Sequence, residues 1–432
     1  MAQPVFYDPR QARWKRLRGL FDILGISVML LVAFFIYNAL QGEQLPELIW
    51  QAQKKPYRSL KENEREKARE RRRKQAALRS NHKPKSKLLP VSLDPEEGVR
   101  AAFYAPWDAA SFSSLREYAR QVDLLYPDWL HVLTPDGHLQ GVDDQTNTYF
   151  PVIQNSAHGS TVRPLDDKVM PFLKAENTGM EVFPMVNNSD GVNWVDITPF
   201  LNSPDSRALF RQQVAQFLAT DKYRGLMIDF EEIEPKAQPG YMALLSELSN
   251  DLRNKGMKLY VSVPPHNEDF NYSAVASHVD GVVLMNYDEH YPEADPGPVA
   301  SQDWFVDNLK FARKVVPVDK LICAIGNYGY DWVRKPKHGK PPADVRDTNV
   351  SVQDAWLVAR DSDEDIDFDG DSSNPHFSYM DEANRRHDIW FLDAVTALNE
   401  MRAAQQLGIQ TFALWRLGAE DRSLWRVWDV PG

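Results

Sequence analysis

The stretch between residues 98 and 432 predicts an α/β fold, because eight short apolar segments alternate there with amphipathic helical segments. Strands that alternate with helices pair in parallel through right-handed crossovers. Eight such units predict a (β/α)8 TIM barrel with insertions. The alternative, a doubly wound open sheet, usually carries a glycine-rich phosphate loop after its first strand, whereas residues 103–107 read Phe-Tyr-Ala-Pro-Trp.

The chain before the barrel divides into three parts. Residues 1–18 form a polar, basic tail, and residues 19–40 are almost wholly apolar, with Asp22 as the one charge. About 20 apolar residues span a bilayer core as a helix, so a single transmembrane helix is expected at 19–40. A cleaved signal peptide is the alternative, but the apolar run is long for one and no small-residue cleavage site clearly follows Leu40. Residues 41–97 are expected to be a charged linker.

Basic residues predict the orientation of this helix. Those of the N-terminal tail lie close to the apolar segment, whereas the next basic cluster begins only at Lys54. The positive-inside rule then places the N-terminus inside the cell and the barrel outside it. Residues 51–90 carry 15 Lys and Arg against 4 Glu, which predicts a solvated stalk or disordered spacer that can also attract anionic lipid headgroups.

The charge of the globular part argues against nucleic acid as a partner. The whole chain has a net charge of −11, and because residues 1–90 are basic, residues 91–432 carry −23. So acidic a domain repels a phosphate backbone. The one cysteine, Cys323, lies in an apolar run and is expected to be a buried core residue without a disulfide.

The predicted strands are short apolar runs bounded by polar or turn residues. They are Arg100–Ala105, Trp129–Leu133, Glu181–Val186, Gly225–Phe230, Lys258–Val263, Gly281–Tyr287, Leu321–Ile325 and Thr411–Trp415. The predicted helices are Ser111–Leu125, Pro164–Asn177, Ser203–Thr220, Gln238–Lys255, Ser301–Val315 and Trp390–Leu407. Two long segments, 135–163 and 333–388, follow strands two and seven. Loops of that length are usually functional or carry structure of their own, so both are expected to overhang the active-site face.

The fourth predicted strand is the centre of the functional hypothesis. It is apolar until its end, where Asp229 and Glu231 lie two residues apart and therefore point the same way. Catalytic residues of barrel enzymes lie at the carboxyl ends of strands. The plain alternative is a strand that runs into a solvated acidic loop. The other strand ends carry aromatic, amide and charged side chains: Tyr104, Trp107, Asp108, Asn187, Asn188, His266, Asn286, Tyr287, Asp288, Asn327, Tyr328, Tyr330, Trp415 and Arg416.

Carboxylates, aromatic rings and amides together are typical of a carbohydrate site, because rings stack on the apolar faces of sugars while amides and acids bind hydroxyls. The sequence shows no zinc-ligand spacing, nucleophile elbow or phosphate loop, so no cofactor and no metal is expected. Asp365, Asp367, Asp369 and Gly370 match the first half of a calcium loop. The twelfth position is His376 rather than Glu, so a solvated acidic loop is expected there.

Residues 99–428 resemble glycoside hydrolase family 18, the chitinase-like barrels. The resemblance rests on the family's strand-four signature Asp-x-x-Asp-x-Asp-x-Glu, on its Tyr in a Met-x-Tyr-Asp setting after strand six, and on its Trp in strand eight. These positions fall, in chain order, on Arg224, Met227, Asp229, Glu231, Tyr287 and Trp415.

The resemblance implies a role for each matching residue. Glu231 would be the general acid, and Asp229 would orient the substrate's 2-acetamido group as it attacks the anomeric carbon. Tyr287 would hydrogen-bond the acetamido carbonyl, and Trp415 would form the floor of the −1 sugar site. This is substrate-assisted, retaining hydrolysis. Further substrate-binding residues are expected at Tyr104, Trp107, Asn187, Asn286 and Asp288.

Two positions depart from the signature. Arg224 replaces its first Asp and Met227 its second, which in the family normally shares a proton or hydrogen bond with the third. Met227 gives Asp229 an apolar neighbour, so Asp229 must find another partner. Family members that act on bacterial cell walls and spores also tend to lose this Asp while keeping the Asp-x-Glu pair, so activity, at a reduced level, is expected.

The implied function is a membrane-anchored glycosidase on the periplasmic side of a bacterial inner membrane. Its substrate would be a β-linked polysaccharide that contains N-acetylglucosamine: chitin-like, peptidoglycan or exopolysaccharide. The chain also resembles the first module of bacterial proteins in which a polysaccharide deacetylase and a family-2 glycosyltransferase follow, which implies polysaccharide-synthesis machinery as a partner. The alternatives are a non-catalytic carbohydrate-binding barrel that assists exopolysaccharide or cell-wall synthesis, and a structural scaffold.

Overall fold

The computed structural model describes residues 98–428, except 144–147, 157–158, 164, 166–167, 268–269, 293 and 335–346, together with helical residues 25, 26, 28 and 29. The predicted tail and linker, and almost all of the predicted transmembrane helix, lie outside the described residues. No helix in the described part of the chain is long and apolar enough to cross a membrane. The chain divides into two compact units, 1–87 and 88–432, and all features below belong to the second.

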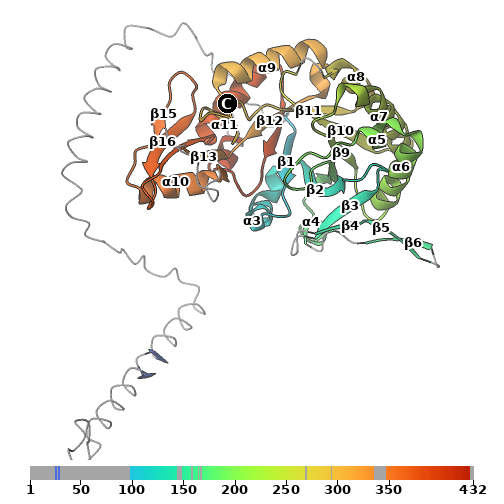
Figure 1. Cartoon of the computed structure of the whole chain (residues 1–432), viewed down its shortest axis with the longest axis horizontal. Coiled ribbons are helices and arrows are strands. Elements are labelled where there is room, and N and C mark those ends of the chain that lie inside the picture. Colours follow the sequence, from blue (N-terminus) through green and yellow to red (C-terminus); the bar gives the residue numbers. More distant parts are fainter. Residues whose placement is uncertain are drawn as a thin grey trace, which may run out of the picture. The chain divides into compact units, whose positions relative to one another are not determined.

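Eight parallel strands form a closed barrel in the second unit (Figure 1). Around the barrel they are β1 (Arg100–Tyr104), β2 (Leu124–Val132), β8 (Met185–Asn187), β9 (Gly225–Asp229), β10 (Lys258–Val263), β11 (Gly281–Met285), β12 (Leu321–Gly326) and β18 (Thr411–Trp415). The short β7 (Glu181–Val182) precedes β8 and also pairs with β2. The first and last strands pair in parallel and close the ring, which confirms the predicted TIM barrel.

Helices surround the barrel (Figure 1). They are α3 (Ala109–Tyr118), α4 (Val169–Glu176), α5 (Thr198–Asn202), α6 (Pro204–Leu218), α7 (Gln238–Arg253), α8 (Tyr272–His278), α9 (Gln302–Val315), α11 (Ala394–Gln406) and α12 (Leu424–Trp428). Local sequence explains where they begin. Ser203, for example, caps α6 by accepting a hydrogen bond from the Ser206 N–H at 3.2 Å, and Pro204 follows as its first residue.

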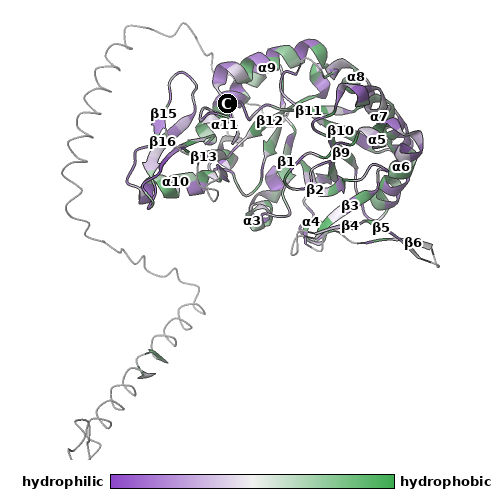
Figure 2. Cartoon of the chain, in the orientation of Figure 1, coloured by the Kyte–Doolittle hydropathy of each residue, from purple (hydrophilic) through white to green (hydrophobic). Residues whose placement is uncertain are grey.

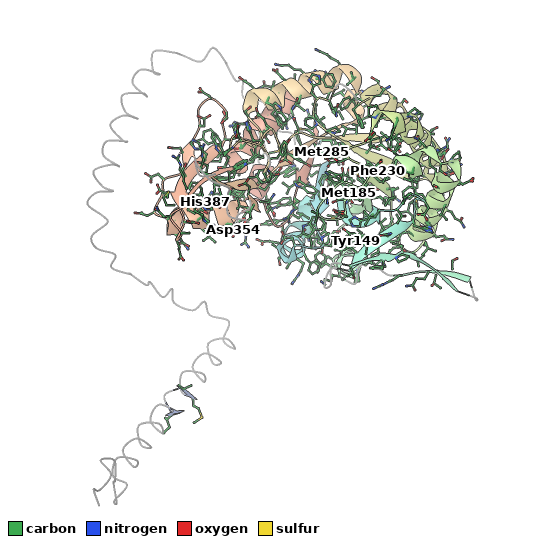
Figure 3. All side chains as sticks on the ribbon, viewed as in Figure 1. Tyr149, Met185, Phe230, Met285, Asp354 and His387 are labelled. Carbon is green, nitrogen blue, oxygen red and sulfur yellow. The ribbon has the colours of Figure 1, made fainter. Side chains whose placement is uncertain are left out.

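Each helix buries an apolar face against the strands. On α9 the buried residues Phe305, Leu309 and Ala312 recur at the spacing of a helical face, and Figure 2 shows green and purple residues on different sides of the outer helices. Inside the barrel, a separate cluster of mainly aromatic and methionine side chains fills the space between the strands. Figure 3 labels one of its members, Met185. This inner cluster includes Phe103, Tyr126, Phe183, Met185, Met227 and Tyr260.

Both long segments have structure of their own, as predicted. After β2, the described residues form β3 (Leu139–Asp143) and β4 (Thr148–Pro151), which extend the barrel sheet by antiparallel pairing, and a separate hairpin of β5 (Ile153–Ser156) and β6 (Gly159–Val162). After β12, a five-stranded antiparallel sheet and one helix form an insertion beside the barrel (Figure 1). Its elements are β13 (Gly329–Val333), β14 (Thr348–Val350), α10 (Val352–Asp361), β15 (Asp367–Phe368), β16 (Pro375–Met380) and β17 (Arg386–Phe391).

Several predicted boundaries were wrong. The second strand begins at Leu124, inside the helix predicted for Ser111–Leu125, and that helix ends at Tyr118. The helix predicted from Trp390 begins at Ala394, because Trp390 belongs to β17 of the insertion. Helices α5, α8, α10 and α12 were not predicted at all.

Candidate active site

The two acidic residues of strand four lie at the carboxyl end of β9, as predicted. Met227 and Asp229 face the barrel interior, since each is the register partner of an inward-facing residue of β8, namely Met185 and Asn187. The strand ends at Asp229, and Glu232 then adopts a left-handed backbone conformation with φ of 52°. This turn after Glu231 ends the extended backbone at the mouth of the barrel.

Asn188 holds the backbone of Glu231 in place. Its side-chain oxygen accepts a hydrogen bond from the Glu231 N–H at 2.9 Å, and its amide nitrogen donates to the Glu231 carbonyl at 3.0 Å. The same nitrogen donates to the Val195 carbonyl at 2.9 Å. An asparagine after β8 therefore determines where the backbone of the proposed acid lies.

Burial disfavours the ionised forms of the Asp229 and Glu231 carboxyl groups. Burial raises the pKa of Glu231 well above its usual value, and the negative charges of Asp229, Asp288 and Glu232 add to the rise. Burial also raises the pKa of Asp229 to about 6, an effect that the hydroxyl of Ser262 on β10 opposes. Burial thus favours the protonated form of Glu231, whereas a pKa of about 6 lets Asp229 ionise at neutral pH. Acid catalysis next to a charged group requires a difference of this kind.

Aromatic rings line the same end of the barrel. Tyr287 follows β11 and stacks on Trp415 of β18, with ring centroids 6.4 Å apart and planes at 23°. Phe103 of β1 meets Trp415 edge-on, with centroids 5.2 Å apart. Burial raises the pKa of Tyr287 well above its usual value, helped by the charges of Asp229, Asp288 and Glu231. Tyr287 is therefore a hydroxyl donor close to all three carboxyl groups.

Asp288, next to Tyr287, is anchored by the start of the insertion. Its carboxylate accepts hydrogen bonds from the hydroxyl of Tyr328 and, at 2.8 Å, from that of Tyr330. Burial raises the pKa of Asp288 to about 6, and the two tyrosine hydroxyls oppose the rise. Asp288 has φ of 65°, so the backbone turns at this residue, three positions after the end of β11. The insertion thus contributes directly to the site.

Asn187, the predicted substrate-binding residue of β8, is buried and bonded within the protein. Its amide nitrogen donates to Asp128 at 2.7 Å, and its oxygen lies 2.8 Å from Nδ1 of His131. Asp128 and His131 both belong to β2 and had not been predicted as site residues. The ring of His131 packs edge-on against Tyr149 of β4, which Figure 3 labels, with centroids 5.0 Å apart.

Three other residues were predicted to bind substrate, and two of them face away from the barrel interior. Asn286 faces α9, where its amide donates to the Phe305 carbonyl and accepts from Asn308, both at 3.0 Å. Tyr104 belongs to the cluster between strands and helices, because Phe103 is the β1 residue that faces inward. Both side chains thus lie on the helix-facing side, because a shift of one residue along extended backbone reverses the face. Their roles in substrate binding stay predictions. Trp107 lies in the turn after β1 and is 51% exposed, which leaves its ring open to a ligand.

The two departures from the strand-four signature lie in different places. Arg224 precedes β9 at the opposite end of the barrel and pairs with Glu181 at 2.9 Å. Because Asp229 lies five residues farther along an extended strand, roughly 16 Å away, Arg224 has no direct contact with the site. Met227 is 0% exposed within the inner cluster, directly below Asp229.

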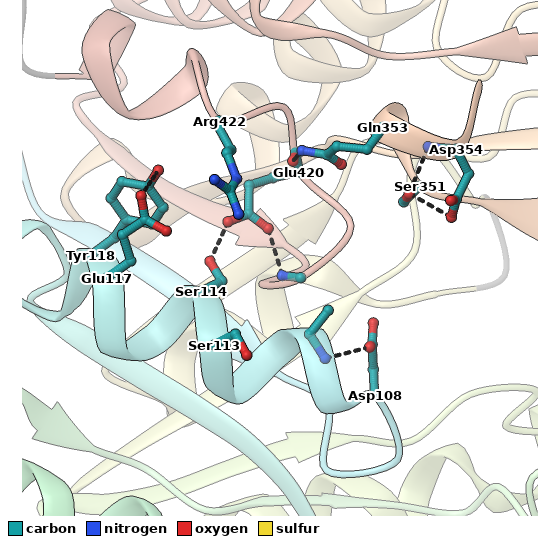
Figure 4. Close-up of a pocket in the computed structure, with 12 residues that line it drawn as sticks. Asp108, Ser113, Ser114, Glu117, Tyr118, Ser351, Gln353, Asp354, Glu420 and Arg422 are labelled. Atoms are coloured by element: carbon teal, nitrogen blue, oxygen red, sulfur yellow. Dashed lines mark hydrogen bonds between the residues drawn. The ribbon is translucent and has the colours of Figure 1, made fainter. Parts of the chain in front are cut away.

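A polar hollow of about 340 Å³ lies beside α3 (Figure 4). Its buried Glu420 accepts hydrogen bonds from the Ser114 hydroxyl, the Gly418 N–H and, at 3.1 Å, the Trp425 indole. Neither Asp229 nor Glu231 lines it. Arg416, which follows Trp415, pairs with Asp108 at the rim of the hollow.

In the described part of the chain, no group of three or more His, Cys, Asp or Glu side chains could hold a metal ion. In the calcium-like stretch, Asp369 instead accepts hydrogen bonds from the Ser372 N–H at 2.8 Å and from the Ser372 hydroxyl at 2.7 Å. This carboxylate is used to close a turn.

Comparison with known proteins agrees with the geometry. The family model Glycosyl hydrolases family 18 matches residues 139–420. Two curated relatives come from Bacillus subtilis: the glycosylase YvbX, 28% identical over 240 residues that are 52% of this chain and 66% of the relative, and a cortical fragment-lytic enzyme, 24% identical over 63% of this chain and 64% of the relative. The chain therefore spans less than two thirds of the length of these relatives.

Solved structures show the same fold. The spore cortex-lytic enzyme SleL of Bacillus megaterium superposes with a TM-score of 0.65 at 20% identity, over 79% of this chain and 75% of that one. A chitinase from Chromobacterium violaceum superposes with a TM-score of 0.64 at 23% identity, over 76% of this chain and 97% of that one.

Proposed function

The chain belongs to glycosyl hydrolase family 18 and is a glycoside hydrolase, and from this premise we propose that it cleaves β-linked polysaccharides that contain N-acetylglucosamine. Similarity to proteins named cortical fragment-lytic enzyme and chitinase supports this substrate class. The acetamido group of such a sugar also supplies the nucleophile that the protein itself lacks in substrate-assisted retention.

The proposed mechanism assigns one task to each residue. Glu231 protonates the leaving glycosidic oxygen, and ionised Asp229 orients the acetamido nitrogen and stabilises the positive charge that develops on it. Tyr287 donates a hydrogen bond to the acetamido oxygen. Trp415, stacked on Tyr287, provides the apolar floor for the sugar ring.

The observation that carries this proposal is the difference between the two carboxyl groups of β9. The pKa of Glu231 is raised well above its usual value, whereas that of Asp229 is raised only to about 6. The protonated form is therefore favoured at Glu231, while a pKa of about 6 lets Asp229 carry its charge at neutral pH. Two titratable groups whose environments separate their pKa values are typical of acid and charge-stabilising roles.

Release of reducing ends from N-acetylglucosamine oligomers and from peptidoglycan tests the proposal. Glu231→Gln keeps the shape of the side chain but cannot donate a proton, so we expect kcat/KM to fall by about 10²–10⁴-fold. Glu234→Gln is the matched control, because Glu234 lies in the same segment after β9 and is exposed. It should retain activity within about threefold, as a surface substitution does. Equal rates for wild type and Glu231→Gln on every such polymer would exclude the mechanism.

A second candidate function is carbohydrate binding without cleavage. Met227 favours it, because this fully buried apolar side chain stands where the family has an acid that shares a proton or hydrogen bond with the residue at Asp229. Isothermal titration with chitooligosaccharides distinguishes the two functions. Binding by wild type and Glu231→Gln alike, with no products from either, supports this second candidate.

We also propose that residues 19–40 anchor the barrel to a membrane on the periplasmic side, where polysaccharide-synthesis proteins are possible partners. The length and apolar composition of this segment support the proposal. In cells, the full chain should sediment with membranes and be cleaved by protease only after the outer membrane is opened. Recovery of the chain in the soluble fraction would contradict it.

A further inference from the structure

Asp229 finds no hydrogen-bonding side chain on its own strand. The residue two positions earlier on the same face is Met227, which packs in the apolar inner cluster. Among the described residues, Oδ1 of Asp229 is buried without a hydrogen-bond partner. A buried carboxylate is costly unless polar neighbours stabilise it, so other strands must supply them. The Ser262 hydroxyl of β10 is one such neighbour.

Strand β2 provides an acid close to Asp229. Asn187 is the register partner of Asp229 across the β8–β9 ladder, and its amide donates to Asp128 at 2.7 Å. Asp128 is 5% exposed. The carboxyl groups of Asp128 and Asp229 therefore lie on either side of one asparagine side chain at the mouth of the barrel.

An irregularity in β2 makes this arrangement possible. Residues three apart on a regular strand face opposite sides of the sheet, yet Asp128 and His131 both bond to Asn187. The pairing of β2 with β8 shifts between Asp128 and Leu130. This bulge turns both polar side chains inward, and bulges often reorient side chains next to active sites.

The hydrogen bonds define the orientation of every group in this cluster. The Ser189 N–H, which can only donate, bonds to Oδ1 of Asn187 at 2.9 Å. The amide nitrogen of Asn187 therefore faces Asp128, and Nδ1 of His131 must carry the proton that it donates to Oδ1. Burial lowers the pKa of His131 to about 4, so His131 is neutral at pH 7 and adds no positive charge.

We propose that Asp128 is a positioning residue for Asp229: a neutral acid on β2 that replaces the acid missing from β9 at Met227. The inference rests on the proposed function, because it assumes that Asp229 acts as the charged residue beside the acetamido group. Asn187 holds Asp128 in place, and His131 fixes the orientation of Asn187. The polar environment that the family signature builds along one strand is built here across three.

Electrostatics agree with a neutral Asp128. Burial raises the pKa of Asp128 well above its usual value, and the charge of Asp229 raises it further. Two buried carboxyl groups so close together cannot both ionise readily, so the one with the higher pKa keeps the proton. The other titratable groups that interact with this pair are Glu231, Tyr241 of α7, Tyr287 and Tyr149.

Kinetics of the full chain on chitooligosaccharides test the positioning role. Asp128→Leu makes the surroundings of Asp229 less polar, so we expect kcat/KM to fall by about 10–100-fold. In the plot of kcat/KM against pH, the acidic limb should move upward by roughly 0.5–1 pH unit. Asp128→Asn keeps a polar neutral group and should lose much less. Met227→Asp, added to Asp128→Leu, should raise kcat/KM at least fivefold above that of Asp128→Leu alone. It should also return the acidic limb of the pH profile to its wild-type position.

Thermal unfolding supplies a readout that does not depend on activity. A raised pKa for Asp128 means that the folded state binds its proton more tightly than the unfolded state, so wild type loses stability as the pH rises above about 4. Asp128→Asn has no such proton. We expect the unfolding midpoint of wild type to fall relative to Asp128→Asn by about 1–3 °C per pH unit between pH 4 and 7.

The two measurements separate this inference from the proposed function. If wild type shows no turnover on any polymer, the proposed function fails, and the unfolding midpoints still decide whether Asp128 holds a proton. If the unfolding midpoints of wild type and Asp128→Asn differ by the same amount at every pH from 4 to 7, the inference is overturned. So would an active Asp128→Leu protein whose acidic limb stays in place, or one whose activity falls only in proportion to its stability and is not restored by Met227→Asp.

Discussion

Asn188 and Glu231 are joined by two hydrogen bonds, from the Glu231 N–H to the Asn188 oxygen at 2.9 Å and from the Asn188 amide to the Glu231 carbonyl at 3.0 Å. The residue after β8 therefore determines the position of the residue after β9. Because both bonds involve backbone groups of Glu231, they fix its main chain and leave its carboxyl group free to contact a substrate.

Asn188→Ala should therefore reduce catalysis without removing any proposed catalytic group. The substitution removes three bonds, two to Glu231 and one to the Val195 carbonyl. Their loss leaves buried backbone groups unpaired and lets Glu231 shift, so we expect kcat to fall by about 10–100-fold. The free energy of unfolding should fall by about 2–4 kcal/mol, because each unpaired buried polar group costs about 1–3 kcal/mol. Steady-state kinetics and urea unfolding measure the two effects.

Asn193→Ala is a useful control for this substitution. Asn193 lies in the same loop after β8, but it is exposed, so both stability and kcat should stay close to wild type. A binding measurement gives the fraction of Asn188→Ala that is folded. If the unfolded fraction accounts for the whole loss of kcat, the positioning role of Asn188 is contradicted.

Activity should depend on pH in a bell-shaped manner. Asp229 must be ionised, and its pKa is about 6, so kcat/KM should fall as the pH drops below about 6. Glu231 must be protonated, and its pKa is raised well above its usual value, so activity should persist at neutral pH and decline only when Glu231 loses its proton.

Asp288 requires a control, since its pKa is also about 6. Asp288→Asn removes that titration while Asp229 remains. An acidic limb that persists in Asp288→Asn would assign it to Asp229, whereas its disappearance would assign it to Asp288.

Tyr287→Phe isolates one hydroxyl group. The ring that stacks on Trp415 remains, but the proposed donor to the acetamido oxygen is lost. Removal of a single such donor typically lowers kcat by about 10²–10³-fold, and we expect a loss in this range with little change in the unfolding midpoint.

Tyr126→Phe is the matched control within the same barrel interior. Its hydroxyl is buried without a hydrogen-bond partner among the described residues, so its removal should leave kcat unchanged and should not destabilise the fold. Equal effects of the two Tyr→Phe substitutions would remove the case for a specific role of Tyr287.

The barrel could be predicted from local sequence because its strands are buried, continuous and separated by amphipathic helices. The bounds predicted for Lys258–Val263 and Thr411–Trp415 are those of β10 and β18. β2 was predicted too short because Pro127 and Asp128 lie in its middle, and both residue types are rare inside strands. The sheet of the insertion could not be predicted from local patterns, because β13 pairs with β17 across more than fifty residues.

The site residues likewise divide into those that local sequence could predict and those that it could not. Asp229, Glu231, Tyr287 and Asp288 could be found because they directly follow apolar strands. Asp128 could not, because its role depends on a bulge and on a hydrogen bond to a residue 59 positions away. No pattern within β2 indicates that an acid there faces the same interior as β9.

Glu400 provides a last prediction, outside the proposed active site. It lies on α11, which packs against β12, and both of its carboxyl oxygens are buried without a hydrogen-bond partner among the described residues. Burial raises the pKa of Glu400 well above its usual value, so the folded protein keeps a proton that the unfolded chain releases above pH 4.5. This linkage makes Glu400 increasingly unfavourable as the pH rises from about 4.5 to 7.

Glu400→Leu should therefore stabilise the protein, by about 1–3 kcal/mol at pH 7, because it removes a buried polar group without partners. The gain should shrink as the pH falls toward 4.5, where glutamate is protonated in both states. Urea unfolding at pH 5 and pH 7 measures this difference, with the exposed Glu382→Leu as the control that should change stability little at either pH. Destabilisation of Glu400→Leu at both pH values would show that the Glu400 carboxyl group makes favourable interactions in the folded protein.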